Sequence, residues 1–122
     1  MAEEIEKLVH YLKGDPNVIF AYLFGSYALG LNGRDSDIDI AVYFKEPPEG
    51  DLYLELLVKL SEVAGRDVDL LVLNRASPFM RYHVLKSGKL LFSKSLEVLA
   101  DFKEKTLKDY DEYLWLRKAY GD

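Results

Sequence analysis

The sequence predicts an α/β (α+β) domain in which helices pack on a small mixed β-sheet, in the order α-β-β-α-β-α-β-α. Two observations predict this class. Short apolar runs rich in β-branched and aromatic residues alternate along the chain with longer segments that have helical apolar spacing. Breaks containing glycine, proline or asparagine separate these segments. Such alternation places helices against a sheet, although periodicity alone does not choose among α/β and α+β topologies.

The first half of the chain contains one helix and two strands. Residues 3–13 carry apolar side chains at the i, i+3, i+4, i+7 spacing of an amphipathic helix, and the Gly-Asp-Pro-Asn sequence at 14–17 ends it. Two apolar runs with strand composition follow, separated by a short helical turn and a loop. In chain order these four segments are 18–24, 26–31, 32–35 and 38–44.

The second half alternates helix and strand after the Pro-Pro-Glu-Gly break at 47–50. Gly65 and Arg66 end the first of these helices, and the segment 74–78 is a helix cap with proline near the first turn. The predicted elements are a helix over about 51–64, a strand at 67–73, a helix from Pro78 to about Lys86, a strand at 89–93 and a helix over about 95–119.

The bulk composition limits the possible functions. A chain of 122 residues forms one domain, here 1–122, and it has no apolar run of the roughly 20 residues that a membrane span needs. The acidic N-terminus is no signal peptide, and the absence of cysteine makes the cytoplasm the default compartment. A net charge of −5 argues against binding to duplex nucleic acid, which requires many phosphates to be neutralised.

Asp37 and Asp39 are the first candidates for chemistry. Carboxylates at i and i+2 on a strand point to the same face, roughly 6–7 Å apart at Cα. Buried side by side they would repel by about 2–3 kcal/mol at an effective dielectric near 20, whereas a divalent cation would bind both. The structural alternative is an acidic turn that enters a half-buried strand.

A two-metal centre needs three or more carboxylates that converge on one point. The only acidic residues on another predicted strand are Asp67 and Asp69, which share a face. Either residue could supply the third carboxylate, and a solvated strand edge is the structural alternative for Asp67.

Gly25 and Ser26 lie where the first strand turns into a helical start. Glycine allows close approach of a phosphate, amides at a helix start favour an anion, and the serine hydroxyl can add a hydrogen bond. The alternative is a plain turn at a strand end. Ser36 precedes Asp37 and either orients it or caps the loop.

The spacing Gly25-Ser26, ten residues, Asp37-x-Asp39 resembles the active-site signature of nucleotidyltransferases of the DNA polymerase beta superfamily. The whole chain resembles the minimal nucleotidyltransferases, the antitoxins of prokaryotic HEPN-type toxins. The resemblance implies the nucleotidyltransferase fold, two Mg²⁺ ions and ATP as substrate. It maps the third carboxylate to Asp69, which would also take the proton of the attacking hydroxyl, and it implies transfer of AMP to a tyrosine of a cognate HEPN-type toxin, with release of pyrophosphate.

The segment from Arg81 to Gly88 also resembles the minimal family, so Arg81 is a candidate contact to nucleotide or partner. A surface ion pair is the alternative for a single helical arginine. Many relatives carry a basic residue at the position of Leu29, and its absence leaves Arg34 or Arg81 to take that role.

The last predicted helix is rich in aromatic residues, and near its end it is apolar on more than one side. Exposed aromatics mark partner surfaces, so we expect this end to bind the toxin or to form a homo-oligomer; core packing of the whole helix is the alternative.

Two other functions remain open: a non-catalytic antitoxin that neutralises its toxin by binding, and a small-molecule nucleotidyltransferase acting on an aminoglycoside-like acceptor. An adjacent gene for a small helical protein with an Arg-x(4–6)-His motif would favour the antitoxin functions over the small-molecule one.

Overall fold

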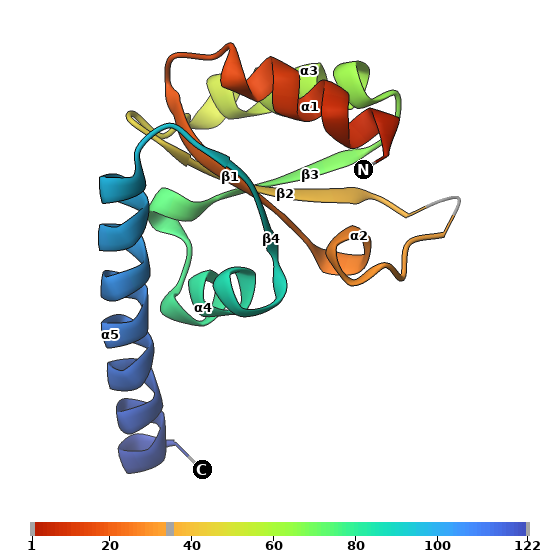
Figure 1. The fold of residues 1–122 in the computed structure, drawn as a ribbon. Coiled ribbons are helices and arrows are strands. Elements are labelled where there is room, and N and C mark those ends of the chain that lie inside the picture. Colours follow the sequence, from red (N-terminus) through yellow and green to blue (C-terminus); the bar gives the residue numbers. More distant parts are fainter. Residues whose placement is uncertain (1, 34–35, 122) are drawn as a thin grey trace.

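The computed structural model describes residues 2–33 and 36–121 and shows a four-stranded mixed sheet between helices (Figure 1). The elements are α1 (Glu3–Lys13), β1 (Val18–Phe24), α2 (Gly25–Leu29), β2 (Ile38–Phe44), α3 (Gly50–Ala64), β3 (Val68–Val72), a 3₁₀ helix η1 (Leu73–Arg75), α4 (Pro78–Ser87), β4 (Lys89–Ser93) and α5 (Leu96–Tyr120).

The strands lie in the order β3-β2-β1-β4. β1 is antiparallel to both β2 and β4, while β2 and β3 are parallel. The parallel pairing brings the starts of β2 and β3 to the same end of the sheet. Because β1 runs the opposite way, its last residue, Phe24, pairs with Asp39 near the start of β2.

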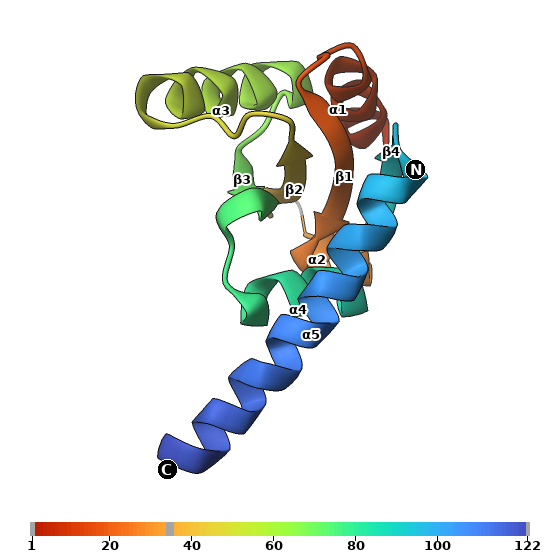
Figure 2. The same ribbon diagram turned by 90° about the vertical axis from the view of Figure 1, so that its left-hand side faces the viewer.

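Helices cover both faces of the sheet. α1 and α3 pack on one face, and α4 and the first half of α5 pack on the other (Figures 1 and 2). Alternate strand residues divide between two buried clusters: Ile38, Ile40 and Val42 belong to the α1/α3 side, and Ala41 belongs to the α4/α5 side with Phe102. Each face of β2 therefore packs against one layer of helices.

Local sequence explains where the helices begin and end. Ile5, Leu8 and Leu12 form the buried stripe of α1. α3 ends at Gly65, whose φ of 73° is a left-handed conformation that favours glycine. α4 begins at Pro78 after Ser77, whose hydroxyl accepts a hydrogen bond from the Met80 amide.

The four strands and the predicted helices are confirmed, with two corrections, one to the order of elements and one to the bounds of the third strand. The helical turn expected at 26–31 is α2 and begins already at Gly25, so the observed order has a helix between β1 and β2. The third strand was expected over 67–73, but it spans Val68–Val72. Asp67 therefore lies in the turn before β3, and Leu73 begins η1. The side-chain oxygen of Asn74 accepts a hydrogen bond from the backbone N–H of Phe44, and its side-chain nitrogen donates one to the Phe44 carbonyl. These bonds extend the β2–β3 pairing beyond the end of β3.

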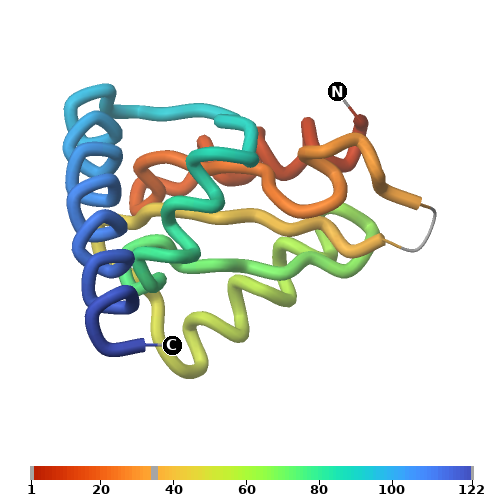
Figure 3. The backbone as a smooth tube through the Cα atoms, turned by 90° about the horizontal axis from the view of Figure 1, so that it is seen from below, coloured from red at the N-terminus to blue at the C-terminus, as the bar shows by residue number. Residues whose placement is uncertain are grey.

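α5 extends beyond the body of the protein. Leu99, Phe102 and Thr106 are buried, whereas residues 114–120 are exposed. α5 stands at the opposite end of the sheet from α2 (Figures 1 and 3). Among the described residues, no helix combines the length and the apolar character needed to cross a lipid bilayer.

Candidate active site

Asp39 and Asp69 lie directly opposite each other on the parallel strands β2 and β3. Asp39 lies between Ile38 and Ile40, which are buried on the α1/α3 side, so its side chain points to the α4/α5 face. The same alternation between Val68 and Leu70 turns Asp69 to that face. The structure therefore brings together the two carboxylates that the sequence places on different strands.

The electrostatics of Asp39 include Asp37 as a third carboxylate. Burial raises the pKa of Asp39 above its ordinary value, and the negative charges of Asp69 and Asp37 raise it further. Asp39 is half-buried, whereas Asp37 and Asp69 are exposed. Asp39 is thus the inner member of an acidic group that opens to solvent.

Gly25 lies against Asp39. It has a φ of 69°, and a β-carbon at this position would collide with Asp39 Oδ2. The Gly25-Ser26 turn and the Asp39 carboxylate can therefore approach this closely only because residue 25 is glycine. Ser26, half-buried, follows in the first turn of α2, where backbone amides lack intrahelical partners.

Ser36 closes the loop before Asp37. Its hydroxyl accepts a hydrogen bond from the Gly33 amide at 2.8 Å, and its own amide bonds the Gly33 carbonyl at 3.4 Å. This is the loop-capping role that the sequence left open, and a contact from Ser36 to Asp37 stays a prediction. Arg34, the other cation considered for the triphosphate, falls outside the described residues.

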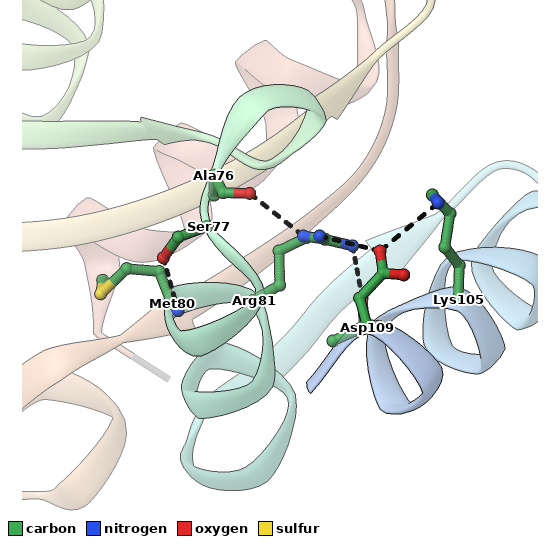
Figure 4. A network of polar contacts seen from close by, with 7 residues as sticks. Ala76, Ser77, Met80, Arg81, Lys105 and Asp109 are labelled. Carbon is green, nitrogen blue, oxygen red and sulfur yellow. Dashed lines mark hydrogen bonds and ion pairs between the residues drawn. The ribbon is translucent and has the colours of Figure 1, made fainter. Parts of the chain in front are cut away.

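Arg81 belongs to a polar network that joins α4 to α5 (Figure 4). Its Nε donates to the Ala76 carbonyl at 3.1 Å, and its guanidinium reaches Thr106 Oγ1 at 3.4 Å and Asp109 Oδ2 at 3.1 Å. Lys105 is the second cation beside Asp109. Arg81 therefore forms an ion pair with Asp109, as the alternative to a functional role expected. A contact from Arg81 to nucleotide stays a prediction.

Arg66 is a residue of this region that sequence reasoning treated only as part of a helix end. Its guanidinium donates a hydrogen bond to the Tyr27 hydroxyl and lies 5.8 Å from the Tyr27 ring centre. This contact ties the α3–β3 turn to the helix that carries Ser26. The two residues are 39 positions apart, so no local pattern could have indicated the pair.

The residue types fit a hard divalent cation, because carboxylate oxygens are its preferred ligands. Within residues 2–33 and 36–121, however, no three His, Cys, Asp or Glu side chains are already arranged to hold a metal ion. Mg²⁺ in nucleotide-dependent enzymes usually uses one or two carboxylates, water and substrate phosphates rather than a protein cage. Burial first, and then the charges of Asp69 and Asp37, raise the pKa of Asp39, and a bound cation would relieve the repulsion among these carboxylates.

A groove of about 600 Å³ opens beside the carboxylates, at the edge of the sheet formed by β3. Its lining includes Asp37 and Asp69, Leu57, Val58 and Glu62 of α3, and Asp67. We call it the β3-edge groove. A larger groove, of about 690 Å³, lies beside Tyr53 and Arg75 and has none of the site carboxylates in its lining. The candidate carboxylates Asp37 and Asp69 therefore open onto the smaller one.

A glycine-serine turn set against paired carboxylates at one end of a mixed sheet defines the nucleotidyltransferase class. Comparison with known proteins agrees, because the family described as Polymerase beta, Nucleotidyltransferase matches residues 6–97. The chain belongs to this family.

Within the family the chain resembles protein adenylyltransferases. It is 34% identical over 117 residues to Protein adenylyltransferase MntA of Shewanella oneidensis, a match that covers 95% of this chain and 84% of the relative. The fold matches a chain of a toxin-antitoxin structure with AMP-PNP, with a TM-score of 0.81, 34% identity, and coverage of 95% of this chain and 91% of that one.

A second solved structure is a tri-AMPylated Shewanella oneidensis HEPN toxin in complex with an MNT antitoxin. It matches with a TM-score of 0.74 and 32% identity over 95% of this chain and 88% of that chain. The resemblance to the minimal nucleotidyltransferases and the predicted fold are thereby confirmed.

Proposed function

We propose that this protein is an antitoxin that transfers AMP from ATP to a tyrosine hydroxyl of a cognate HEPN-type toxin and thereby silences it. The observation that carries the proposal is the contact between the Gly25-Ser26 turn and Asp39, which is itself paired with Asp69. The AMPylated toxin in complex with an MNT antitoxin supports the choice of acceptor.

The reaction is an in-line displacement at the α-phosphorus of ATP. The tyrosine oxygen forms a bond to phosphorus, the bond from phosphorus to the bridging oxygen breaks, and pyrophosphate leaves with that electron pair. The tyrosine proton passes to Asp69, from which solvent removes it. Gly25 and Ser26 hold the phosphates that depart, through backbone amides and one hydroxyl.

We assign the metal ligands to Asp37, Asp39 and Asp69, with two Mg²⁺ ions expected. When bound, these ions would neutralise phosphate charge and hold the reacting oxygens in place. Asp39 matters most among the three, because it is the inner carboxylate and borders both the phosphate turn and Asp69.

The exposed end of α5 is assigned to partner binding. Leu114, Trp115, Leu116 and Tyr120 expose apolar surface on a part of the helix that extends from the body (Figure 2). Exposed aromatic and aliphatic side chains of this kind are typical of interface cores. This surface would hold the toxin, while the acceptor tyrosine reaches the carboxylates.

The two other functions have less support. A binder without catalysis has no need for a glycine whose missing β-carbon makes room for Asp39, or for Asp69 in register with it. A small-molecule transferase needs a pocket for its acceptor, and the groove beside the carboxylates is an open one at a sheet edge.

Intact mass measurement separates these functions. The protein is mixed with ATP, Mg²⁺ and the product of the adjacent gene, and that product is weighed. We expect a gain of one or more AMP units, lost with Asp39→Asn and kept with Asp101→Asn, an exposed carboxylate on α5. Neutralisation without a gain in mass would identify a binder. Transfer to an aminoglycoside but not to the neighbouring protein would identify the small-molecule enzyme.

A further inference from the structure

The β3-edge groove continues directly from the candidate active site. Asp37 and Asp69 belong to both, and the remaining lining comes from α3, the α3–β3 turn and Val68 of β3. Across the sheet, the order is the Gly25-Ser26 turn after β1, Asp39 on β2, Asp69 on β3, and then the groove. In the order across the strands, the phosphate turn and the groove therefore lie on opposite sides of the carboxylates. The α3 wall of the groove belongs to the α1/α3 face, whereas Asp39 and Asp69 point to the other face, so the groove meets the carboxylates at the β3 edge.

In-line displacement requires this opposition. The attacking oxygen and the leaving oxygen lie on opposite sides of the phosphorus in the transition state. If the departing phosphates lie at Gly25 and Ser26, the acceptor hydroxyl must approach from the side of β3. Of the two grooves beside β3, the β3-edge groove is the one whose lining includes Asp37 and Asp69.

The chemistry of the groove indicates what it would accept. Leu57 is half-buried and Val58 is 56% exposed, so the α3 wall offers apolar surface. Glu62 and Asp67 are exposed carboxylates that border it. Arg66 also lines the groove, but its guanidinium binds the Tyr27 hydroxyl. When cations neutralise the catalytic carboxylates, the two negative charges of Glu62 and Asp67 still exceed the single positive charge of Arg66 in this lining.

A peptide would not bind here by adding a strand to β3. The Val68 amide donates to Ser61 Oγ at 3.1 Å, and the Leu70 carbonyl accepts from the Tyr53 hydroxyl at 2.7 Å. Side chains of α3 thus occupy backbone groups along β3, which is an edge strand. Recognition would depend on side chains of the acceptor rather than on its backbone.

We propose that the β3-edge groove docks the acceptor segment of the protein substrate, with Glu62 and Asp67 selecting a basic side chain next to the modified hydroxyl. The apolar wall of Leu57 and Val58 packs against the neighbouring part of the same segment. This inference rests on the proposed function, and it adds the sequence preference of the acceptor and the residues that set it.

The test compares tyrosine peptides that carry either Lys or Glu beside the tyrosine, with kcat and KM measured for AMP transfer by wild type and variants. Glu62→Gln and Asp67→Asn should each raise KM for the Lys peptide about two- to fivefold, the range of an exposed ion pair, and leave KM for ATP unchanged. Glu55→Gln, an exposed carboxylate on α3 outside the groove lining, is the matched control and should have no effect.

Charge reversal gives the second arm. Glu62→Lys should reverse the preference so that the Glu peptide becomes the better acceptor, a rescue that a merely structural role would not produce. Equal KM for both peptides in wild type, or equal effects of the control and groove variants, would overturn the groove proposal and leave the transferase activity standing. A loss of kcat in Asp67→Asn would instead make Asp67 a catalytic carboxylate. Absence of transfer to any protein or peptide by wild type would overturn both proposals.

Discussion

At the scale of single residues, Gly25 meets two separate requirements. Its φ of 69° costs a side-chain-bearing residue about 1–2 kcal/mol, and a β-carbon would also collide with Asp39 Oδ2. Gly30 has nearly the same φ, 71°, but nothing lies within 4 Å of the β-carbon position. The two glycines therefore separate backbone strain from crowding at the carboxylate.

We expect Gly25→Ala to abolish AMP transfer, because the collision must displace Asp39 or the phosphate turn. Gly30→Ala should lose a similar 1–2 kcal/mol of unfolding free energy and keep transfer at close to the wild-type rate. Chemical denaturation and intact-mass kinetics on both variants check this. Equal loss of activity in both would mean that backbone strain alone explains Gly25.

Asp39 should make the metal-free protein less stable at neutral pH. Its pKa is raised above the ordinary 3.8, by burial and then by Asp69 and Asp37, so the folded state binds the proton more tightly than the unfolded state does. The stability that this proton provides is present at low pH and is lost as pH rises from the ordinary value through the raised one. Above that window, ionised Asp39 opposes folding.

Asp39→Asn should therefore unfold at an equal or higher temperature than wild type at pH 7 in EDTA. The difference should shrink as pH falls below the ordinary value of 3.8, where the carboxyl is mostly protonated in both the folded and the unfolded state. Mg²⁺ should raise the melting temperature of wild type more than that of the variant, since binding to the native state stabilises it. Circular dichroism melts at pH 7 and in acid check this, and a lower melting temperature of the variant at pH 7 in EDTA would assign Asp39 a structural role.

At the scale of elements, the pair Arg81–Asp109 fixes α5 to α4. The hydrogen bond from Arg81, with Lys105 in support, holds the pKa of Asp109 below its ordinary 3.8. Its contribution to stability is therefore full above that value and is lost as pH falls from 3.8 through the lowered pKa.

Asp109→Asn should be less stable than wild type at neutral pH, and the stabilities of the two proteins should converge in acid. Urea titrations at pH 7 and at a series of pH values falling below 3.8 measure this, with the exposed Asp111→Asn as a control that should match wild type throughout.

Elements also show how far the sequence could predict this protein. Apolar spacing located every strand and long helix, and the spacing from Gly25 to Asp39 identified the turn and the first carboxylates. The residues alone could not decide between Asp67 and Asp69, because that choice depends on the register of two parallel strands, which is a tertiary property. The Arg66–Tyr27 contact and the α3 side chains on the β3 edge likewise join segments that have no common local pattern.

At the scale of the whole molecule, catalysis and partner binding are assigned to opposite ends. The carboxylates lie at the α2 end of the sheet, and α5 stands at the other (Figures 1 and 3). Leu99, Phe102 and Thr106 hold the first half of α5 to the body, whereas Trp115 is 64% exposed. Changes at the end of α5 should therefore alter association without altering the fold or the chemistry.

The double variant Leu114→Ser/Trp115→Ser tests this separation. We expect at least a tenfold weaker affinity for the toxin, because a large aromatic at an interface core typically contributes 2 kcal/mol or more. The melting temperature and the rate of AMP transfer to a tyrosine peptide should stay at wild-type values, since neither side chain is buried in this chain. Leu96→Ser, also exposed but in the first turn of α5, is the control and should keep full affinity.

Light scattering measures self-association of the protein, and titration calorimetry measures its affinity for the toxin. Loss of self-association with unchanged toxin affinity would make the end of α5 a homodimer surface, because the toxin would then have to bind elsewhere on the molecule.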